Sequence, residues 1–483
     1  MRLAVVQRIL GMLMMIFSIT MLPPVAISVY FNDGAIHAFE QAFGITLLIG
    51  FLIWFPVRKH IEDLRLRDGF LIVAAFWIGL GSVGALPFLL MEAPALSFTD
   101  AMFEAMSGLT TTGATILTGL DYMPQSLLFY RQLLQWLGGM GIIVLAVAIL
   151  PMLGVGGMQL YRAEMAGPVK DSKLTPRITE TAKALWYIYL GLTIACGAAY
   201  YYAGMNAFDA ICHAFSTVAI GGFSTHDANI GYFDSSLINS IAIIFMFIAG
   251  VNFSLHFLAW RGKSLLGYLK DSEFRTYAKG MVGLSVVVIA YLYFVGEYAT
   301  FGETVSAGLF QVVSIATTTG FTTAEFAAWP GALPVMLIFA SFVGGCAGST
   351  GGGMKVMRVL LLYRQGVREI KRLVHPNAEF AVKLGGQTVP PRVIDSVWGF
   401  FAVYVVVFVV MMVIMLIDGV DQVTAFSAIA ASLNNLGPGL GDVAAGFSSL
   451  SDLSKWVCVA AMLLGRLEIF TLLVLVSRTY WQN

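Results

Sequence analysis

Thr317-Thr318-Thr319-Gly320-Phe321 ends a short apolar segment, and three related sequences recur along the chain. They are Thr110-Thr111-Thr112-Gly113-Ala114, Ala219-Ile220-Gly221-Gly222-Phe223 and Asn434-Asn435-Leu436-Gly437-Pro438. The equivalent glycines lie 109, 98 and 117 residues apart, and each follows a helical stretch too short to cross a membrane. This spacing predicts four copies of one membrane unit, each of which lends one loop to a shared axis.

The composition is that of a polytopic membrane protein. Of the 483 residues, 58% are hydrophobic and 12% are charged, whereas soluble proteins carry roughly 25% charged residues. Long apolar runs such as 70–91, 237–258 and 400–417 approach the length of a membrane span. The four cysteines are scattered without the spacing of a metal site, so we expect neither a metal site nor a disulfide framework.

Each unit has the same order of elements: a span, a half-length helix, a glycine loop and a second span. We expect unit 1 in 69–160, unit 2 in 161–260, unit 3 in 261–375 and unit 4 in 376–483, after two extra spans in 1–68. The predicted fold is an all-α polytopic membrane protein with ten transmembrane helices and four re-entrant pore loops. The four units would surround one pore with pseudo-fourfold symmetry.

The glycine segments are candidates for an ion filter, because a ring of backbone carbonyls can replace the hydration shell of a cation. The filter glycines would be Gly113, Gly222, Gly320 and Gly437, and the carbonyls those of Thr111, Thr112, Ile220, Gly221, Thr318, Thr319, Asn435 and Leu436. Glycine supplies the backbone angles that let consecutive carbonyls point one way. In the alternative interpretation, these glycines and threonines only pack helices together. Recurrence at four matching places favours the filter, and the departures from Thr-Thr in units 2 and 4 predict an asymmetric one.

Charge predicts the orientation in the membrane. Lysines and arginines cluster in loops that share one side with both termini if the spans alternate, and the positive-inside rule makes that side cytoplasmic. The exceptions are Arg131, Lys455 and Arg466. The glycine segments fall on the opposite, acid-rich side, so the filter would face outward. The acids there either concentrate cations or are simply tolerated outside.

Two features below the filter are candidates for a gate. The first is the glycine-rich sequence 344–353, which interrupts the second span of unit 3 and is followed by Lys355. Its glycines are Gly344, Gly345, Gly348, Gly351, Gly352 and Gly353. At about 1 kcal/mol per glycine relative to alanine, this sequence cannot hold a helix alone. We expect a flexible barrier, with small-residue helix packing as the alternative.

The second gate candidate is Arg466, near the centre of the last span. A charge at this depth is costly and usually faces a cavity or a partner. It either forms a positive barrier to cations or pairs with an acid of another span, such as Asp209 or Glu468 of a neighbour.

Together these residues resemble the TrkH/KtrB/HKT superfamily of potassium transporters, and most closely its TrkH branch, over nearly the whole chain. The resemblance rests on the four loops, on 221–227 (Gly-Gly-Phe-Ser-Thr-His-Asp), on 375–378 (His-Pro-Asn-Ala) and on 434–439 (Asn-Asn-Leu-Gly-Pro-Gly). It implies a potassium pore in each protomer, a homodimer, and a bacterial inner-membrane location. It also implies a cytoplasmic regulatory ring, TrkA, that would carry the nucleotide (ATP/ADP or NAD). In the family the glycine-rich loop obstructs the pore and the matching arginine faces it.

The leading functional interpretation is therefore potassium uptake through a gated pore. A second keeps the fold and couples potassium to H⁺ or Na⁺ as a symporter. A third, a membrane enzyme or assembly scaffold, lacks a nucleophile triad or a metal motif in the sequence. We expect no cofactor on this chain and no nucleic-acid partner. The basic segment 355–392 would meet membrane lipid or the regulator.

Overall fold

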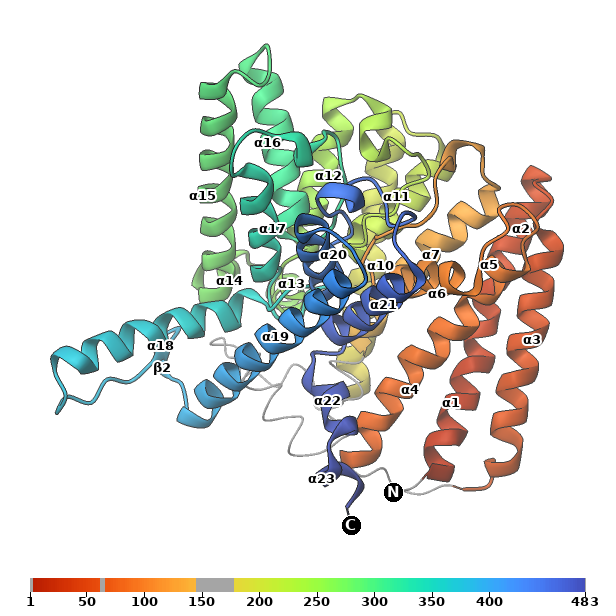
Figure 1. Ribbon diagram of the computed structural model, residues 1–483, viewed down its shortest axis with the longest axis horizontal. Coiled ribbons are helices and arrows are strands. Elements are labelled where there is room, and N and C mark those ends of the chain that lie inside the picture. Colours follow the sequence, from red (N-terminus) through yellow and green to blue (C-terminus); the bar gives the residue numbers. More distant parts are fainter. Residues whose placement is uncertain (1–2, 61–65, 145–177, 483) are drawn as a thin grey trace.

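The computed structural model describes residues 3–60, 66–144 and 178–482. In these residues the chain is almost entirely helical (Figure 1). Six segments are long and apolar enough to cross a membrane: Leu3–Phe31, Ile36–Val57, Asp68–Leu90, Lys183–Tyr202, Ser272–Val295 and Pro391–Ile417. The protein is a helical membrane protein, as the composition predicts.

Two spans precede the repeated units. The first consists of α1 (Leu3–Ser18), η1 (Ile19–Met21) and α2 (Leu22–Phe31), and the second of α3 (Ile36–Trp54) and η2 (Phe55–Val57). Gly11 and Gly50 let α1 and α3 touch, because a Cβ on Gly11 would lie 2.7 Å from the Gly50 carbonyl oxygen. Figure 1 shows these helices side by side at one edge of the molecule.

The four units then follow in order, each with a short helix before its glycine segment. Unit 1 contains α4 (Leu66–Gly84), α5 (Leu86–Leu90), α6 (Phe98–Leu109), η3 (Leu120–Tyr122) and α7 (Gln125–Val144). Unit 2 contains α10 (Ile178–Tyr202), α11 (Ala207–Ala219), η5 (Asn229–Phe233), α12 (Ser236–Ala249) and α13 (Phe253–Gly262), and α14 (Leu266–Lys270) follows within the range of unit 3. The predicted boundary at 160/161, the basic residues of 162–177 and the end of the predicted span 129–150 lie outside the described residues.

Units 3 and 4 complete the described chain. Unit 3 contains α15 (Ser272–Val295), α16 (Phe301–Ala316), η6 (Phe326–Ala328), α17 (Leu333–Val343) and α18 (Val356–Val374). The strands β1 (Lys383–Leu384) and β2 (Gln387–Thr388) form a small antiparallel hairpin. Unit 4 contains α19 (Pro391–Ile417), α20 (Gln422–Asn434), η7 (Gly441–Val443), α21 (Asp452–Arg466), α22 (Phe470–Val476) and α23 (Arg478–Trp481).

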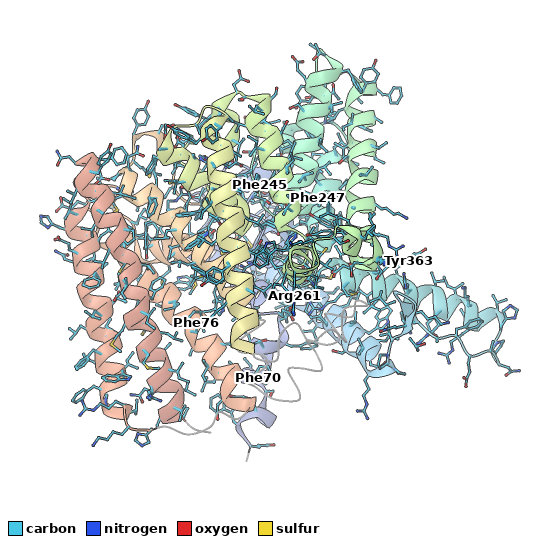
Figure 2. All side chains as sticks on the ribbon, turned by 180° about the vertical axis from the view of Figure 1, so that it is seen from behind. Phe70, Phe76, Phe245, Phe247, Arg261 and Tyr363 are labelled. Atoms are coloured by element: carbon cyan, nitrogen blue, oxygen red, sulfur yellow. The ribbon has the colours of Figure 1, made fainter. Side chains whose placement is uncertain are left out.

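The second spans of units 2, 3 and 4 are broken. The break in unit 3 lies at the glycine-rich sequence 344–353, as predicted, whereas the breaks within 237–258 of unit 2 and 454–476 of unit 4 correct the expectation of continuous helices there. α12 and α13 meet at a 93° bend, and α21 and α22 at a 112° bend. Figure 2 labels Phe245 and Phe247 on α12, and Arg261 beyond the bend in α13. At the break between α12 and α13, backbone groups that have left the helix bond to the glycine-rich sequence. Cys346 N–H donates to Gly250 O at 2.8 Å, and Phe253 N–H donates to Gly348 O at 3.1 Å.

α18 leaves the body of the molecule together with the hairpin, as the arm at one side of Figure 1. Its outer part exposes Ile370 and Leu373 beside the basic residues Lys371 and Arg372. Figure 1 also shows that α1 begins and α23 ends at the same end of the molecule.

Candidate functional site

The four short helices α6, α11, α16 and α20 start in the same way. Their N-cap residues are Ser97, Asn206, Thr300 and Asp421, and each cap side chain accepts a hydrogen bond from the backbone N–H three residues on. Such caps satisfy donors that a helix leaves free at its first turn. Each helix then carries the negative end of its dipole toward the glycine segment that follows it.

The turns after these helices also repeat. The residue before each glycine donates its N–H to the carbonyl five residues back: Thr112 to Ser107 at 2.9 Å, and Gly221 to Ser216, Thr319 to Ser314 and Leu436 to Ala431 at 2.8 Å. Two residues before each glycine the backbone is left-handed, with φ of 53° at Thr111, 55° at Ile220, 69° at Thr318 and 54° at Asn435. The glycines are left-handed too, with φ of 80°, 80°, 81° and 97° in chain order. Four sequences with different side chains thus adopt one backbone conformation.

The four segments close into a ring. A Cβ on Gly113 would lie 2.1 Å from the Gly221 carbonyl oxygen, one on Gly222 2.1 Å from that of Thr319, and one on Gly320 2.1 Å from that of Leu436. The ring closes where a Cβ on Gly437 would lie 2.9 Å from the Thr112 carbonyl oxygen. Each glycine therefore lets the carbonyl of the next unit approach, in the order 1, 2, 3, 4 and back to 1.

Hydrogen bonds of side-chain hydroxyls and of the Asn435 amide stabilise the ring segments. Thr110 and Thr112 share a hydroxyl hydrogen bond at 2.8 Å, and Thr317 and Thr319 share one at 2.7 Å. The Asn435 amide donates to the Thr112 hydroxyl and to the Met462 carbonyl, both at 3.0 Å. Units 4 and 1 are therefore joined by side chains as well as by backbone contact.

The glycine-rich sequence 344–353 lies against the ends of the short helices and the ring segments of units 2, 3 and 4. Gly352 N–H donates to the Thr318 hydroxyl at 2.7 Å, Gly353 N–H to Asn434 O at 3.0 Å, and the Thr350 hydroxyl to Val218 O at 3.0 Å. No side chain fits at Gly352, because a Cβ there would lie 1.9 Å from the Asn434 carbonyl oxygen. The Lys355 ammonium donates back to the Gly351 carbonyl.

Glu273, at the start of α15, binds one backbone N–H within this loop and one just after it. Its Oε1 accepts from the N–H of Ala347 at 2.7 Å and from that of Met357 at 3.1 Å. The side chain is buried. Nothing in the local sequence marks this role, since the two N–H groups come from residues far along the chain.

Arg466 joins the loop to unit 1. Its two terminal nitrogens donate to the Thr350 carbonyl at 3.0 Å and to the Gly138 carbonyl of α7 at 3.1 Å. Among the described residues of this chain Arg466 is not paired with an acid: Glu468 bonds Arg358 at 2.8 Å, and Asp209 bonds Thr225 at 2.7 Å. Arg466 is buried, and its Nε has no hydrogen-bond partner among the described residues.

Comparisons with known proteins agree with this architecture. Residues 35–483 match the sequence model of TrkH, a cation transport protein. The chain belongs to the TrkH family. It is thus a transport protein and not an enzyme. It is 57% identical to the Trk system potassium uptake protein TrkH of Vibrio parahaemolyticus and 56% identical to that of Escherichia coli, with 99% of each chain covered.

A solved structure gives the same result. The crystal structure of the potassium transporter TrkH from Vibrio parahaemolyticus superposes with a TM-score of 0.93 at 55% identity, and all of both chains is covered. The Trk system potassium uptake protein TrkG of Escherichia coli is more distant, at 40% identity over 99% of each chain.

Sequence reasoning missed an ion pair behind the ring of this TrkH-family chain. Arg131 on α7 and Glu104 on α6 are both fully buried, and Nε lies 2.7 Å from Oε1. Arg131 also donates to Ser224 O at 3.2 Å and to the Thr115 hydroxyl at 3.0 Å. The pair thus joins the segments that leave the ring in units 1 and 2. The sequence does contain one sign of this pair: Glu104 is an acid inside a short apolar helix, where it needs a basic partner.

Lys455, the third basic residue that the charge pattern left unexplained, is also paired. Its ammonium lies 2.7 Å from Asp100 of α6. Asp100 and Glu104 lie one turn apart on α6 and thus on the same side of that helix. Each of them neutralises a basic side chain of a neighbouring helix.

A histidine lies between two acids in the segment that leaves the ring in unit 2. His226 contacts Asp121 of unit 1 through Nδ1 and Asp209 through Nε2 at 3.2 Å, and its ring stacks on Tyr232. Burial opposes protonation of the ring, but the hydrogen bonds to Asp209 and Asp121 outweigh it and raise the pKa of His226. Burial likewise opposes ionisation of Asp121, yet the hydrogen bond from His226 leaves the pKa of that carboxyl lowered.

The groups of this site that could contact an ion are backbone carbonyls rather than side chains. Among residues 3–60, 66–144 and 178–482, no three His, Cys, Asp or Glu side chains gather closely enough to hold a metal ion. The four cysteines are buried and free. The carbonyl ring is therefore the strongest candidate for cation contact in the described chain.

Proposed function

We propose that this chain carries potassium ions into a bacterial cell across the inner membrane, through a pore whose narrowest part is the carbonyl ring. The observation that carries the proposal is the closure of four equivalent segments around one axis, glycine against carbonyl. The relatives named as Trk system potassium uptake proteins support potassium as the ion. The ring faces outward in this proposal, and both termini are cytoplasmic.

The ring would select the ion through its carbonyls. Residues 111, 112, 220, 221, 318, 319, 435 and 436 would replace water around a dehydrated cation. The negative ends of four helix dipoles would add to the attraction. Gly113, Gly222, Gly320 and Gly437 would permit the left-handed backbone that this arrangement needs.

Two barriers would close the pore beneath the ring. The loop 344–353 lies against the short helices and ring segments of units 2, 3 and 4, and Arg466 places a positive charge between the loop and α7. Opening would require Arg466 to leave the Thr350 or Gly138 carbonyl. A homodimer and a cytoplasmic TrkA-type ring that binds the nucleotide would supply the regulation, in line with the name "Trk system" of the relatives.

The second candidate function, symport with H⁺ or Na⁺, has less support. A proton relay needs acids that are free to titrate along the path. Glu104 is paired with Arg131, and Glu468 is paired with Arg358. These pairs disfavour Glu104 and Glu468 as members of a proton relay.

Uptake of ⁸⁶Rb⁺ into liposomes that contain this chain alone tests the proposal. We expect uptake that follows the rubidium gradient, is inhibited by potassium and is inhibited much less by sodium. Equal inhibition by sodium and potassium would contradict the selectivity, and uptake against the rubidium gradient driven by a pH or sodium gradient would establish the symporter instead.

A further inference from the structure

The second segment of the ring lacks the hydroxyls that hold the first and third. Units 1 and 3 each contain a threonine pair, Thr110 with Thr112 and Thr317 with Thr319. Unit 2 has Ala219 and Gly221 at the matching positions. Its backbone nevertheless has the same left-handed geometry as the others, so something else must hold it.

Gln135 of α7 occupies the place of the missing side chain. A Cβ on Gly221 would lie 2.3 Å from Gln135 Cδ, so a larger residue at 221 would require the Gln135 amide to move away. The Gln135 amide uses both ends: Nε2 donates to Gly221 O at 2.6 Å, and Oε1 accepts from Phe223 N–H at 3.2 Å. The side chain is completely buried. Gln135 therefore links the two peptide units on either side of Gly222. We call this pair of hydrogen bonds the clamp.

The clamp belongs to a continuous face of α7. Gln132 Nε2 donates to Phe223 O at 3.2 Å, and the Arg131 guanidinium lies 4.2 Å from the centre of the Phe223 ring. Because α7 is the second helix of unit 1, the segment of unit 2 is held from the neighbouring unit. Gly138, one turn beyond Gln135 on α7, accepts from Arg466.

We propose that Gln135 is a positioning residue that determines ion selectivity, by fixing the direction of the Gly221 carbonyl in the ring. This inference rests on the proposed function. A carbonyl oxygen has two lone pairs, so the bond to Gln135 can orient Gly221 O and still leave it able to contact an ion. Selectivity depends on how many carbonyls reach the ion and how freely they move. Without the clamp, this carbonyl can turn and the ring can adapt to a smaller cation.

The test measures the potassium-to-sodium uptake ratio of purified full-length protein in liposomes. Gln135→Met keeps the size of the side chain and removes both hydrogen bonds, whereas Gln135→Glu keeps the acceptor for Phe223 N–H and loses the donor to Gly221 O. We expect the ratio to fall roughly two- to tenfold in both, as for the loss of one or two buried hydrogen bonds. The matched control is Tyr130→Phe, which removes a buried hydrogen bond of α7 to Gly84 O, away from the ring.

A wild-type ratio in either folded Gln135 variant would overturn the inference. A loss of total uptake at an unchanged ratio would do the same, because it indicates a merely structural role. If neither variant folds, Gly221→Ala supplies the same readout, since its Cβ displaces the amide from the other side. A wild-type protein that does not prefer potassium would instead contradict the proposed function.

Discussion

Arg466 differs from the other buried lysines and arginines of the described residues in what it contacts. Arg131, Lys455 and Arg358 each lie next to a carboxylate. Arg466 meets only carbonyl dipoles among its hydrogen-bond partners, so its positive charge is solvated but not neutralised. If a cation passes the ring by the proposed route, such a charge would repel it.

Replacement of Arg466 tests this repulsion. Gln can still donate to carbonyls but carries no charge, so Arg466→Gln should raise ⁸⁶Rb⁺ flux through the chain alone by roughly tenfold or more. The control is Arg392→Gln, at an exposed position at the start of α19. A folded Arg466→Gln protein with wild-type flux would show that the arginine is only a structural link.

His226 makes the stability of the contacts among Asp121, His226 and Asp209 depend on pH. Its pKa is raised above the ordinary value near 6.5, so the stabilisation by Asp121 and Asp209 is complete below pH 6.5 and is lost as the pH rises through the folded-state pKa. The wild-type melting temperature should therefore fall, relative to that of His226→Gln, as the pH is raised above 6.5. Thermal unfolding in detergent at a series of pH values measures this. Parallel melting curves for the two proteins across that range would contradict it.

At the scale of elements, Glu273 fixes the loop 344–353 to α15 and to the start of α18, in addition to the loop's contacts with the ring. Glu273→Ala would leave the N–H groups of Ala347 and Met357 without a partner, at about 1–3 kcal/mol each. We expect a looser loop and a higher basal ⁸⁶Rb⁺ flux. Glu273→Gln keeps an acceptor and should restore low flux. If Ala and Gln variants both fold and both leak equally, the charge rather than the two hydrogen bonds matters.

The same elements show how far sequence reasoning reaches. The glycine segments could be predicted because each combines a short apolar helix, a polar cap and a glycine within about twenty residues. The breaks of α12 and α21 could not, because they depend on partners distant in sequence: Gly250 O bonds Cys346, and Glu468, left-handed with φ of 53°, bonds Arg358. The role of Gln135 could not be predicted for the same reason, because its hydrogen-bond partners are more than 80 residues away in the sequence.

At the scale of the whole molecule, the ring brings all four units together, but its four contacts are not equally tight. In three of the contacts a Cβ on the glycine would lie 2.1 Å from the next carbonyl oxygen, but at Gly437 the distance is 2.9 Å. Unit 4 also lacks the threonine pair and relies on Asn434 and Asn435. The fourfold repeat of the backbone is therefore closed by a looser contact between units 4 and 1.

This asymmetry predicts a rank order for alanine substitution. Gly113→Ala, Gly222→Ala and Gly320→Ala should each abolish ⁸⁶Rb⁺ uptake, because a Cβ cannot coexist with an oxygen at 2.1 Å. Gly437→Ala needs a smaller shift of its neighbour and should retain the largest share of uptake. Gly296→Ala is the matched control: its φ is 77°, but nothing lies within 4 Å of the added Cβ, so it reports the left-handed strain of about 1–2 kcal/mol alone. If Gly437→Ala is as inactive as the other three while all four proteins fold, the contact between units 4 and 1 is as tight as the rest and the ring is symmetric in function.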